Sequence, residues 1–167
     1  VRMSVDILDN AGKPVKDPDA LTLIYKTIYF DKTFTGGYDK KEGKATGLIQ
    51  DRIPGYNLAQ LAAYPMVNPL WTKDTARSTA SKLVFNYMGA KGDGILNIGE
   101  ESTLFTNIAI PTDWNQTQMQ KVGNYQLKVT AQAIQSKGFA TQSEAYRMLD
   151  EEIKGGTLQE INRGSEN

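Results

Sequence analysis

Carboxylates are the only common catalytic or metal-binding side chains in this chain of 167 residues, because the sequence contains no histidine and no cysteine. The absence of cysteine excludes thiol catalysis, disulfides and cysteine-ligated metal sites, and the absence of histidine excludes a Ser-His-Asp triad and His-bearing zinc sites. Four aspartates near the first turns lack the ligand spacing and the closing glutamate of an EF-hand loop: Asp6, Asp9, Asp17 and Asp19. We interpret them as turn formers and solvated charges.

A second acidic group lies near the end of the chain, where Asp150, Glu151 and Glu152 are adjacent on a predicted helix and therefore point in different directions around it. A glycosidase needs two carboxylates at a fixed separation across a cleft, so a carboxylate-based hydrolase is the least favoured interpretation. The glycine-rich stretches at residues 36–37 and 89–94 match no phosphate-binding motif and predict turns. We therefore expect no catalytic residue, no cofactor and no metal.

Aromatic side chains are the remaining candidates for binding. Tryptophan rings exposed on a β-sandwich can pack against the flat faces of pyranose sugars, whereas rings that face inward belong to the core. We expect Phe85, Phe105 and Tyr125 in the core, since they lie in predicted strands. Trp114, in a polar segment, and Trp71 are the candidates for an exposed binding surface.

The composition limits the partners of the protein. Lys plus Arg and Asp plus Glu both number 19, so the formal net charge is zero and no electrostatic footprint for nucleic acid is present. No apolar run approaches the ~20 residues that a membrane helix needs, so we predict no membrane span. The length is typical of one domain, and we expect residues 1–167 to form it, with residues 157–167 as a flexible tail.

The elements that must position these residues are mostly strands. Alternation over residues 1–8 predicts a strand with Val1, Met3, Val5 and Ile7 on one face. Further strands are predicted over residues 21–30, 81–88, 103–110 and 124–135. Short helices are predicted over residues 57–64, which Asn57 can cap, and 141–153, where Thr141 and Glu144 have capping-box spacing. Loops are predicted over residues 33–47 and 113–123. Together these elements favour a mainly β fold, an antiparallel β-sandwich with one or two accessory helices.

Two segments of the second half resemble a known family. Residues 94–114 read GILNIGEESTLFTNIAIPTDW, and residues 124–139 read NYQLKVTAQAIQSKGF. These segments, with the opening VRMSV and the Trp71-Thr72 pair, resemble the TasA/camelysin family of exported proteins from Gram-positive bacteria. The sequence departs from the family pattern at Ile98, where a proline is usual, and residues 12–69 have no counterpart that we can place. Some family members carry a metalloendopeptidase label, which this chain does not support because it has no HExxH motif.

The resemblance implies a jelly-roll-like sandwich that is secreted and assembles, head to tail with copies of itself, into fibres of the biofilm matrix or cell surface. Assembly in such fibres occurs by donor-strand complementation, in which a strand of one subunit completes the sheet of the next. Other matrix proteins or polysaccharide are further partners that it implies. The signal peptide and first strands of the family do not precede VRMSV here, so we expect the chain to be a fragment or a processed product.

Two roles are open for the first strand in such an assembly. If Val1 is the mature terminus, Val1, Met3, Val5 and Ile7 are the side chains donated to a neighbouring subunit. If the strand is internal, as the resemblance favours, the same side chains line the groove and the donor lies upstream. The alternative function is a secreted binding module that holds polysaccharide or a surface partner through Trp114, Trp71 or exposed tyrosines. In either case we expect no enzyme.

Overall fold

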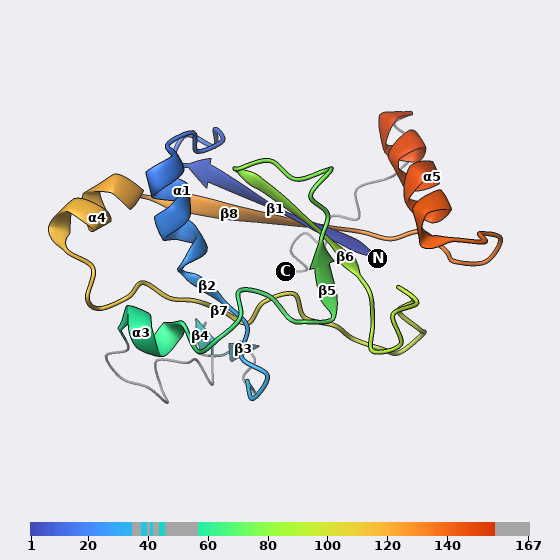
Figure 1. Ribbon diagram of the computed structural model, residues 1–167, viewed down its shortest axis with the longest axis horizontal. Coiled ribbons are helices and arrows are strands. Elements are labelled where there is room, and N and C mark those ends of the chain that lie inside the picture. Colours follow the sequence, from blue (N-terminus) through green and yellow to red (C-terminus); the bar gives the residue numbers. More distant parts are fainter. Residues whose placement is uncertain (35–37, 40, 42–43, 46–56, 156–167) are drawn as a thin grey trace.

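An antiparallel four-stranded sheet, in the order β5-β6-β1-β8, forms the centre of the protein (Figure 1). Its strands are β1 (Arg2–Asp9), β5 (Trp71–Lys73), β6 (Lys82–Tyr87) and β8 (Tyr125–Gln132). The computed structural model describes residues 1–34, 38–39, 41, 44–45 and 57–155. The strands predicted over residues 1–8, 81–88 and 124–135 are confirmed as β1, β6 and β8. They are neighbours in the sheet although they are far apart in the sequence.

The strand β1 is central because it pairs with β6 on one side and with β8 on the other. Its alternation places Met3, Val5 and Ile7 on the face that carries the main core, together with Trp71 and Phe85 of the neighbouring strands. The opposite face carries polar residues, of which Arg2 and Ser4 are nevertheless buried. The sheet thus has one apolar face and one polar face.

The prediction of a strand over residues 21–30 is wrong. Residues Pro18–Tyr25 form helix α1, which begins with the Asp17 side chain accepting hydrogen bonds from the amides of Asp19 and Ala20. Proline at the first helical position is preorganised for a helix, and the buried residues Ala20, Leu21 and Ile24 recur at helical spacing. Only Ile28–Tyr29, strand β2, is extended.

The predicted loop over residues 113–123 is also wrong, because Gln116–Val122 forms helix α4. Asn115 caps it reciprocally: its side chain accepts from the amide of Gln118, whose side chain accepts from the amide of Asn115. The predicted helix near Asn57 is confirmed, in shorter form, as α3 (Leu58–Leu61), with an Asn57–Gln60 capping box.

The predicted strand over residues 103–110 is reduced to β7 (Asn107–Ile108), which pairs with β2 in a second antiparallel sheet. Before β7, the carbonyl of Leu104 accepts instead from the amide of Asn68 in a loop, so no ladder continues there. A third antiparallel pair joins β3 (Tyr38–Asp39) to β4 (Lys44–Ala45), within the predicted loop over residues 33–47. Residues 35–37, 40, 42–43 and 46–47 of that loop, and the predicted tail at residues 157–167, lie outside the described residues.

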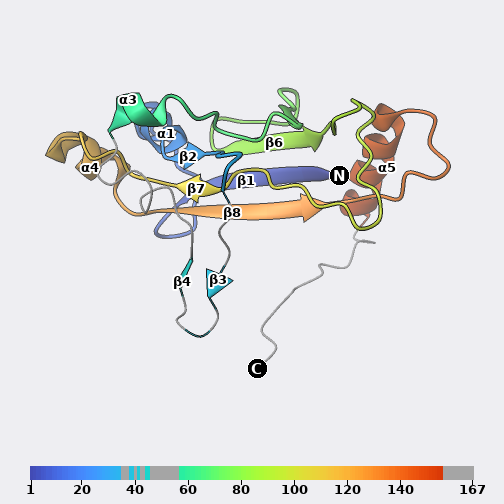
Figure 2. The ribbon, with the colours of Figure 1, turned by 90° about the horizontal axis from the view of Figure 1, so that it is seen from below.

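The final helix is confirmed as α5 (Gln142–Lys154). Thr141 caps it by accepting from the amide of Glu144, while the Glu144 carboxylate accepts from the amide of Ala140, one residue before the cap. The helices α1, α3 and α4 gather at one end of the sheet, and α5 stands at the other end, beside the start of β1 (Figure 2). Among the described residues no helix is both long and apolar enough to cross a membrane.

Candidate functional site

The residues predicted to take part in assembly lie in the middle of the sheet. Val5 and Ile7 are fully buried, and Val1 and Met3 pack against the same core at its margin. Because β1 has a hydrogen-bonded neighbour on each side, these side chains belong to the interior of the subunit's own sheet. The edges available to another chain are β5 and β8.

The two edges differ greatly in length. The strand β5 has three residues, whereas β8 has eight and pairs with β1 along all of them without a bulge. Among the described residues, no strand pairs with the outer side of β8. Lys128 is the one charged residue in this strand, and it contains no proline. Long, regular edges with few such protective features are templates for pairing with another strand.

Backbone hydrogen bonds identify which residues of β8 face outward. The amides of Ile7 and Tyr87 donate to Ser81 and Val1 across the β1–β6 pair, so the odd-numbered residues of β1 bond to β6. In an antiparallel ladder the alternate residues bond to the other neighbour, and these are the even-numbered residues of β1. Their partners in β8 are also even-numbered. The outward backbone groups are therefore those of Tyr125, Leu127, Val129 and Ala131.

Side chains leave this edge open in its second half. Val129 is 45% exposed although it is apolar and faces the same side of the sheet as Val5, its partner in β1. Ala131 is exposed as well, whereas Tyr125 and Leu127 are partly covered by the cluster beneath α1 and α4. No backbone hydrogen bond within the described residues reaches the outer groups of Val129 or Ala131. Within the described residues, the outer backbone groups of Val129 and Ala131 are thus unpaired, beside the exposed apolar side chain of Val129.

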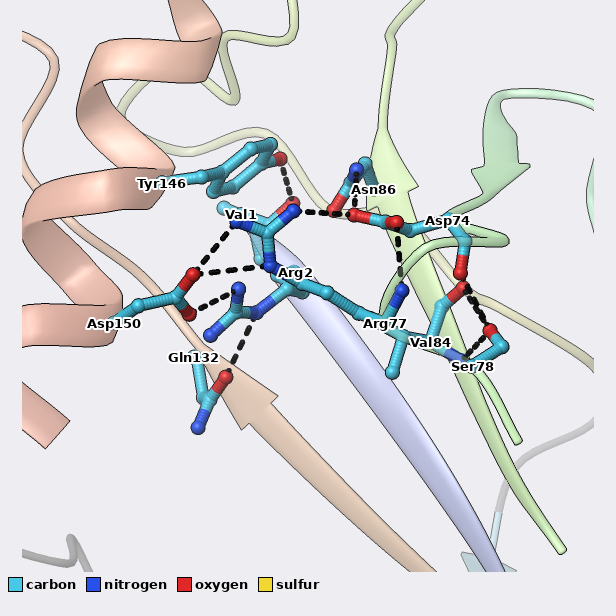
Figure 3. Close-up of polar contacts among 10 residues, drawn as sticks. All are labelled: Val1, Arg2, Asp74, Arg77, Ser78, Val84, Asn86, Gln132, Tyr146 and Asp150. Carbon is cyan, nitrogen blue, oxygen red and sulfur yellow. Dashed lines mark hydrogen bonds and ion pairs between the residues drawn. The ribbon is translucent and has the colours of Figure 1, made fainter. Parts of the chain in front are cut away.

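A network of charged side chains joins α5 to the sheet at the start of β1 (Figure 3). Asp150 of α5 lies between two guanidinium groups. Arg77 donates to its Oδ2 from Nε and Nη2 at 3.0 and 2.7 Å. Nη1 of Arg2 lies 2.7 Å from Oδ1, in an ion pair whose geometry does not complete a hydrogen bond. Nε of Arg2 donates to Oε1 of Gln132 at 2.9 Å, so the network spans β1, β8 and α5.

The network continues through Asp74 to the connection between β5 and β6. Oδ2 of Asp74 accepts from Arg77 Nη1 and from Asn86 Nδ2, and its backbone carbonyl accepts from the hydroxyl of Ser78. Burial alone would raise the pKa values of Asp74 and Asp150, but the hydrogen bonds and charges of their partners outweigh it and hold both below the usual range. Both carboxylates are therefore ionised structural groups.

Tyr146 of α5 completes the contact. Its hydroxyl donates to the backbone carbonyl of Val1 at 2.8 Å, and the guanidinium of Arg2 lies 5.7 Å from the centre of its ring. Burial is the main cause that raises the pKa of Tyr146 to about 12, so this hydroxyl stays a hydrogen-bond donor at neutral pH. The helix is thereby fixed beside the first strand.

The tryptophans do not form the predicted exposed surface. Trp71 is 4% exposed, donates from Nε1 to the hydroxyl of Ser102 and packs edge-on against Tyr87, so the expectation of an exposed Trp71 is wrong. Trp114 is half-buried against the cluster of α1 and α4, and its Nε1 is buried without a hydrogen bond. Trp71 is therefore part of the core, whereas Trp114 is a partly exposed ring packed against the cluster of α1 and α4.

The described residues contain no group of three or more acidic side chains that could hold a metal ion. Asp150 and Glu151 have different partners, because Asp150 faces Arg2 of the sheet while Glu151 pairs with Arg147 in an exposed contact along α5. Sequence reasoning missed the network. Arg2, at the start of a strand predicted from alternation, was its one visible signal, since a buried cation requires a carboxylate partner.

Comparison with known proteins finds no family model, no curated protein and no solved structure that matches this chain. The resemblance to the TasA/camelysin family therefore stays a prediction, carried by the segments quoted above.

Proposed function

We propose that this protein is an extracellular structural protein, the subunit of a biofilm-matrix or cell-surface fibre. In this proposal a strand from a second copy pairs with the open edge of β8, and the repeated head-to-tail contact builds a filament. The completed unit is a jelly-roll-like sandwich, in which the incoming strand extends the four-stranded sheet over the layer formed by β2 and β7.

One observation carries the proposal: β8 is an eight-residue edge strand, regular along its whole length, with an exposed apolar side chain at Val129. An added strand would gain main-chain hydrogen bonds from the outward groups and apolar contact from Val129. The formal net charge of zero supports self-association, because copies of a protein without net charge do not repel one another over long distances.

The donated segment has a required pattern. Because side chains alternate along a strand, the incoming segment must present apolar residues on the side of Val129 and polar residues on the side of Lys128 and Thr130. The side chains of β1 have this alternation, but in the structure β1 is occupied within its own sheet. Donation of β1 would therefore require its exchange between copies.

A proline at the edge tests the proposal. The amide of Val129 points away from β1, so Val129→Pro removes a hydrogen-bond donor from the edge without removing one from the ladder to β1. Val129→Ala is the matched control, because it shortens the same exposed side chain and keeps the amide. We expect the unchanged protein and Val129→Ala to form filaments visible by negative-stain electron microscopy, and Val129→Pro to remain monomeric by light scattering.

Two results would contradict this assignment. Filaments of Val129→Pro that form as readily as those of Val129→Ala would place the contact elsewhere. Persistent monomers of the unchanged protein over time, concentration and pH would remove the fibre itself. Circular dichroism of Val129→Pro must match that of the unchanged protein, which separates loss of assembly from loss of folding.

A further inference from the structure

A cavity of about 310 Å³ opens on the polar face of the sheet, between α5 and the connection from β5 to β6. This volume is within the range of small-ligand sites, ~300–1,000 Å³. Side chains of β1, β6 and β8 form its floor, and the last turn of α5 forms one wall. The cavity is distinct from the proposed pairing edge of β8, because none of Tyr125, Leu127, Val129 and Ala131 lines it.

The lining of this cavity is rich in positive charge. It contains the cationic side chains of Arg2, Arg77, Lys82 and Lys154, and a single carboxylate, that of Asp150. Both oxygens of Asp150 are already engaged by the two guanidinium groups. Among the described residues Lys154 has no ion-pair partner, and the pair of Lys82 with Asp6 is long, at 3.8 Å. The rim of the cavity therefore attracts an anion.

The floor supplies neutral hydrogen-bonding groups. Ser4 is 8% exposed and lines the cavity, yet its hydroxyl makes no hydrogen bond to any residue in the described part of the chain. Gln132 uses Oε1 to accept from Arg2, and its Nε2 has no partner within the same ranges. This hydroxyl is open to the cavity, where it can bond to water or to a ligand. These two groups face the same space as the cations.

Apolar surface completes the site, because Val84 contributes to the floor and Ile153 to the wall. A molecule that satisfies all three features has an oxyanion, several hydroxyl groups and an aliphatic ring face. We propose that this cavity binds an acidic sugar, with the carboxylate near Lys154 and Lys82 and the hydroxyls over Ser4 and Gln132. An inorganic oxyanion would meet the cations but has no aliphatic face to pack against Val84 and Ile153.

The test uses the full chain at low ionic strength and follows backbone amides by NMR during titration with sodium glucuronate. A ligand of this size binds with a dissociation constant of about 1 mM if each heavy atom contributes an ordinary amount. We expect shifts confined to residues of the cavity, weakened by added salt because the contact is between charges. Glucose, which has the same ring without the carboxylate, should bind at least tenfold more weakly.

Three variants localise the site. Lys154→Gln removes a cation at the rim and Ser4→Ala removes the hydroxyl on the floor, and each should weaken glucuronate binding about fivefold. Lys128→Gln is the matched control, because Lys128 is an exposed cation of β8 that does not line the cavity. Its affinity should not change. Ser4→Ala should also unfold at the same urea concentration as the unchanged protein, because its hydroxyl bonds to no described residue.

Several outcomes overturn the proposal. Absence of shifts with glucuronate, or equal shifts with glucose, would remove the acidic-sugar site. Inorganic phosphate that binds as tightly as glucuronate would show that the sugar ring contributes nothing. An equal loss of affinity in Lys128→Gln and Lys154→Gln would show attraction to the whole face instead of binding in the cavity. None of these outcomes bears on filament formation, so this proposal and the proposed function fail independently.

Discussion

Neutralising Asp150 is the perturbation that most directly tests how α5 is held against the sheet. The substitution Asp150→Asn keeps the size of the side chain and removes its negative charge. In the folded protein this charge lies between Arg77 and Arg2, whose side chain is 6% exposed. The variant therefore leaves a buried guanidinium beside a neutral amide.

The expected loss of stability depends on how far water can reach the two arginines that lose their carboxylate partner. Removing one member of a fully buried ion pair costs about 3–5 kcal/mol, because the other charge is left in the interior. Asp150 is 28% exposed and Arg77 is 38% exposed, so solvent replaces much of that half of the contact. Arg2 keeps its hydrogen bond to Gln132. We therefore expect Asp150→Asn to lower the free energy of unfolding by about 2–3 kcal/mol, most of it from Arg2.

The measurement is urea unfolding at pH 7, followed by circular dichroism, with Glu151→Gln as the control. Glu151 is the next residue of α5 and pairs with Arg147 in an exposed i,i+4 contact, which is worth about 0.5 kcal/mol or less. A cost of Asp150→Asn no larger than that of Glu151→Gln would refute the reasoning. It would show that Arg2 does not depend on the carboxylate.

Two further predictions concern the same end of the molecule. Because the folded pKa values of Asp74 and Asp150 lie below the usual value of 3.8, their contribution to stability is present above about pH 4 and is lost as the pH falls through the folded values. The urea midpoint of the unchanged protein should therefore be flat from pH 7 to 5 and fall below pH 4. The fall should be smaller in Asp150→Asn. An identical fall in the two proteins would show that ionised Asp150 does not contribute to this pH dependence. Leu149→Ala removes a fully buried side chain of α5 and should lower the free energy of unfolding in urea by about 2–4 kcal/mol. Ile153→Ala, at a partly exposed position, should lower it by less than about 1 kcal/mol. Equal losses would show that α5 does not pack as described.

Elements whose sequence pattern is local and regular could be predicted. Alternation over residues 124–135 gave β8, and the cap at Thr141 gave the start of α5. The antiparallel arrangement of the sheets, with short helices beside them, also follows from strands spaced by turns. Alternation along one segment does not reveal the order of strands in a sheet. The position of β8 at an edge could therefore not be predicted.

Both wrong elements are helices whose capping residues were not used in the prediction. Residues 21–30 are rich in β-branched and aromatic residues, which have a weak preference for strands. Burial of Leu21 and Ile24 on one helical face outweighs this strand preference. Pro18 behind Asp17, and Asn115 three residues before Gln118, were the local signals of the two helices. Capping signals were thus more informative in these segments than residue preference.

The charged network could not be predicted, because its members come from distant parts of the chain. Arg2, Arg77 and Asp150 meet only once β1, the β5–β6 connection and α5 are in place. From the sequence, Asp150 is one of three adjacent acids that point in different directions around a predicted helix. Tertiary packing makes it the one that faces the sheet, and the same packing creates the cavity beside it.

The proposed pairing at β8 is tested most directly by electron cryomicroscopy of the assembled full-length protein at a resolution that separates strands. We expect a strand from a neighbouring copy along the outer side of β8, hydrogen-bonded to the backbone of Tyr125, Leu127, Val129 and Ala131. Filaments in which this side of β8 faces solvent, or a protein that never assembles, would contradict it.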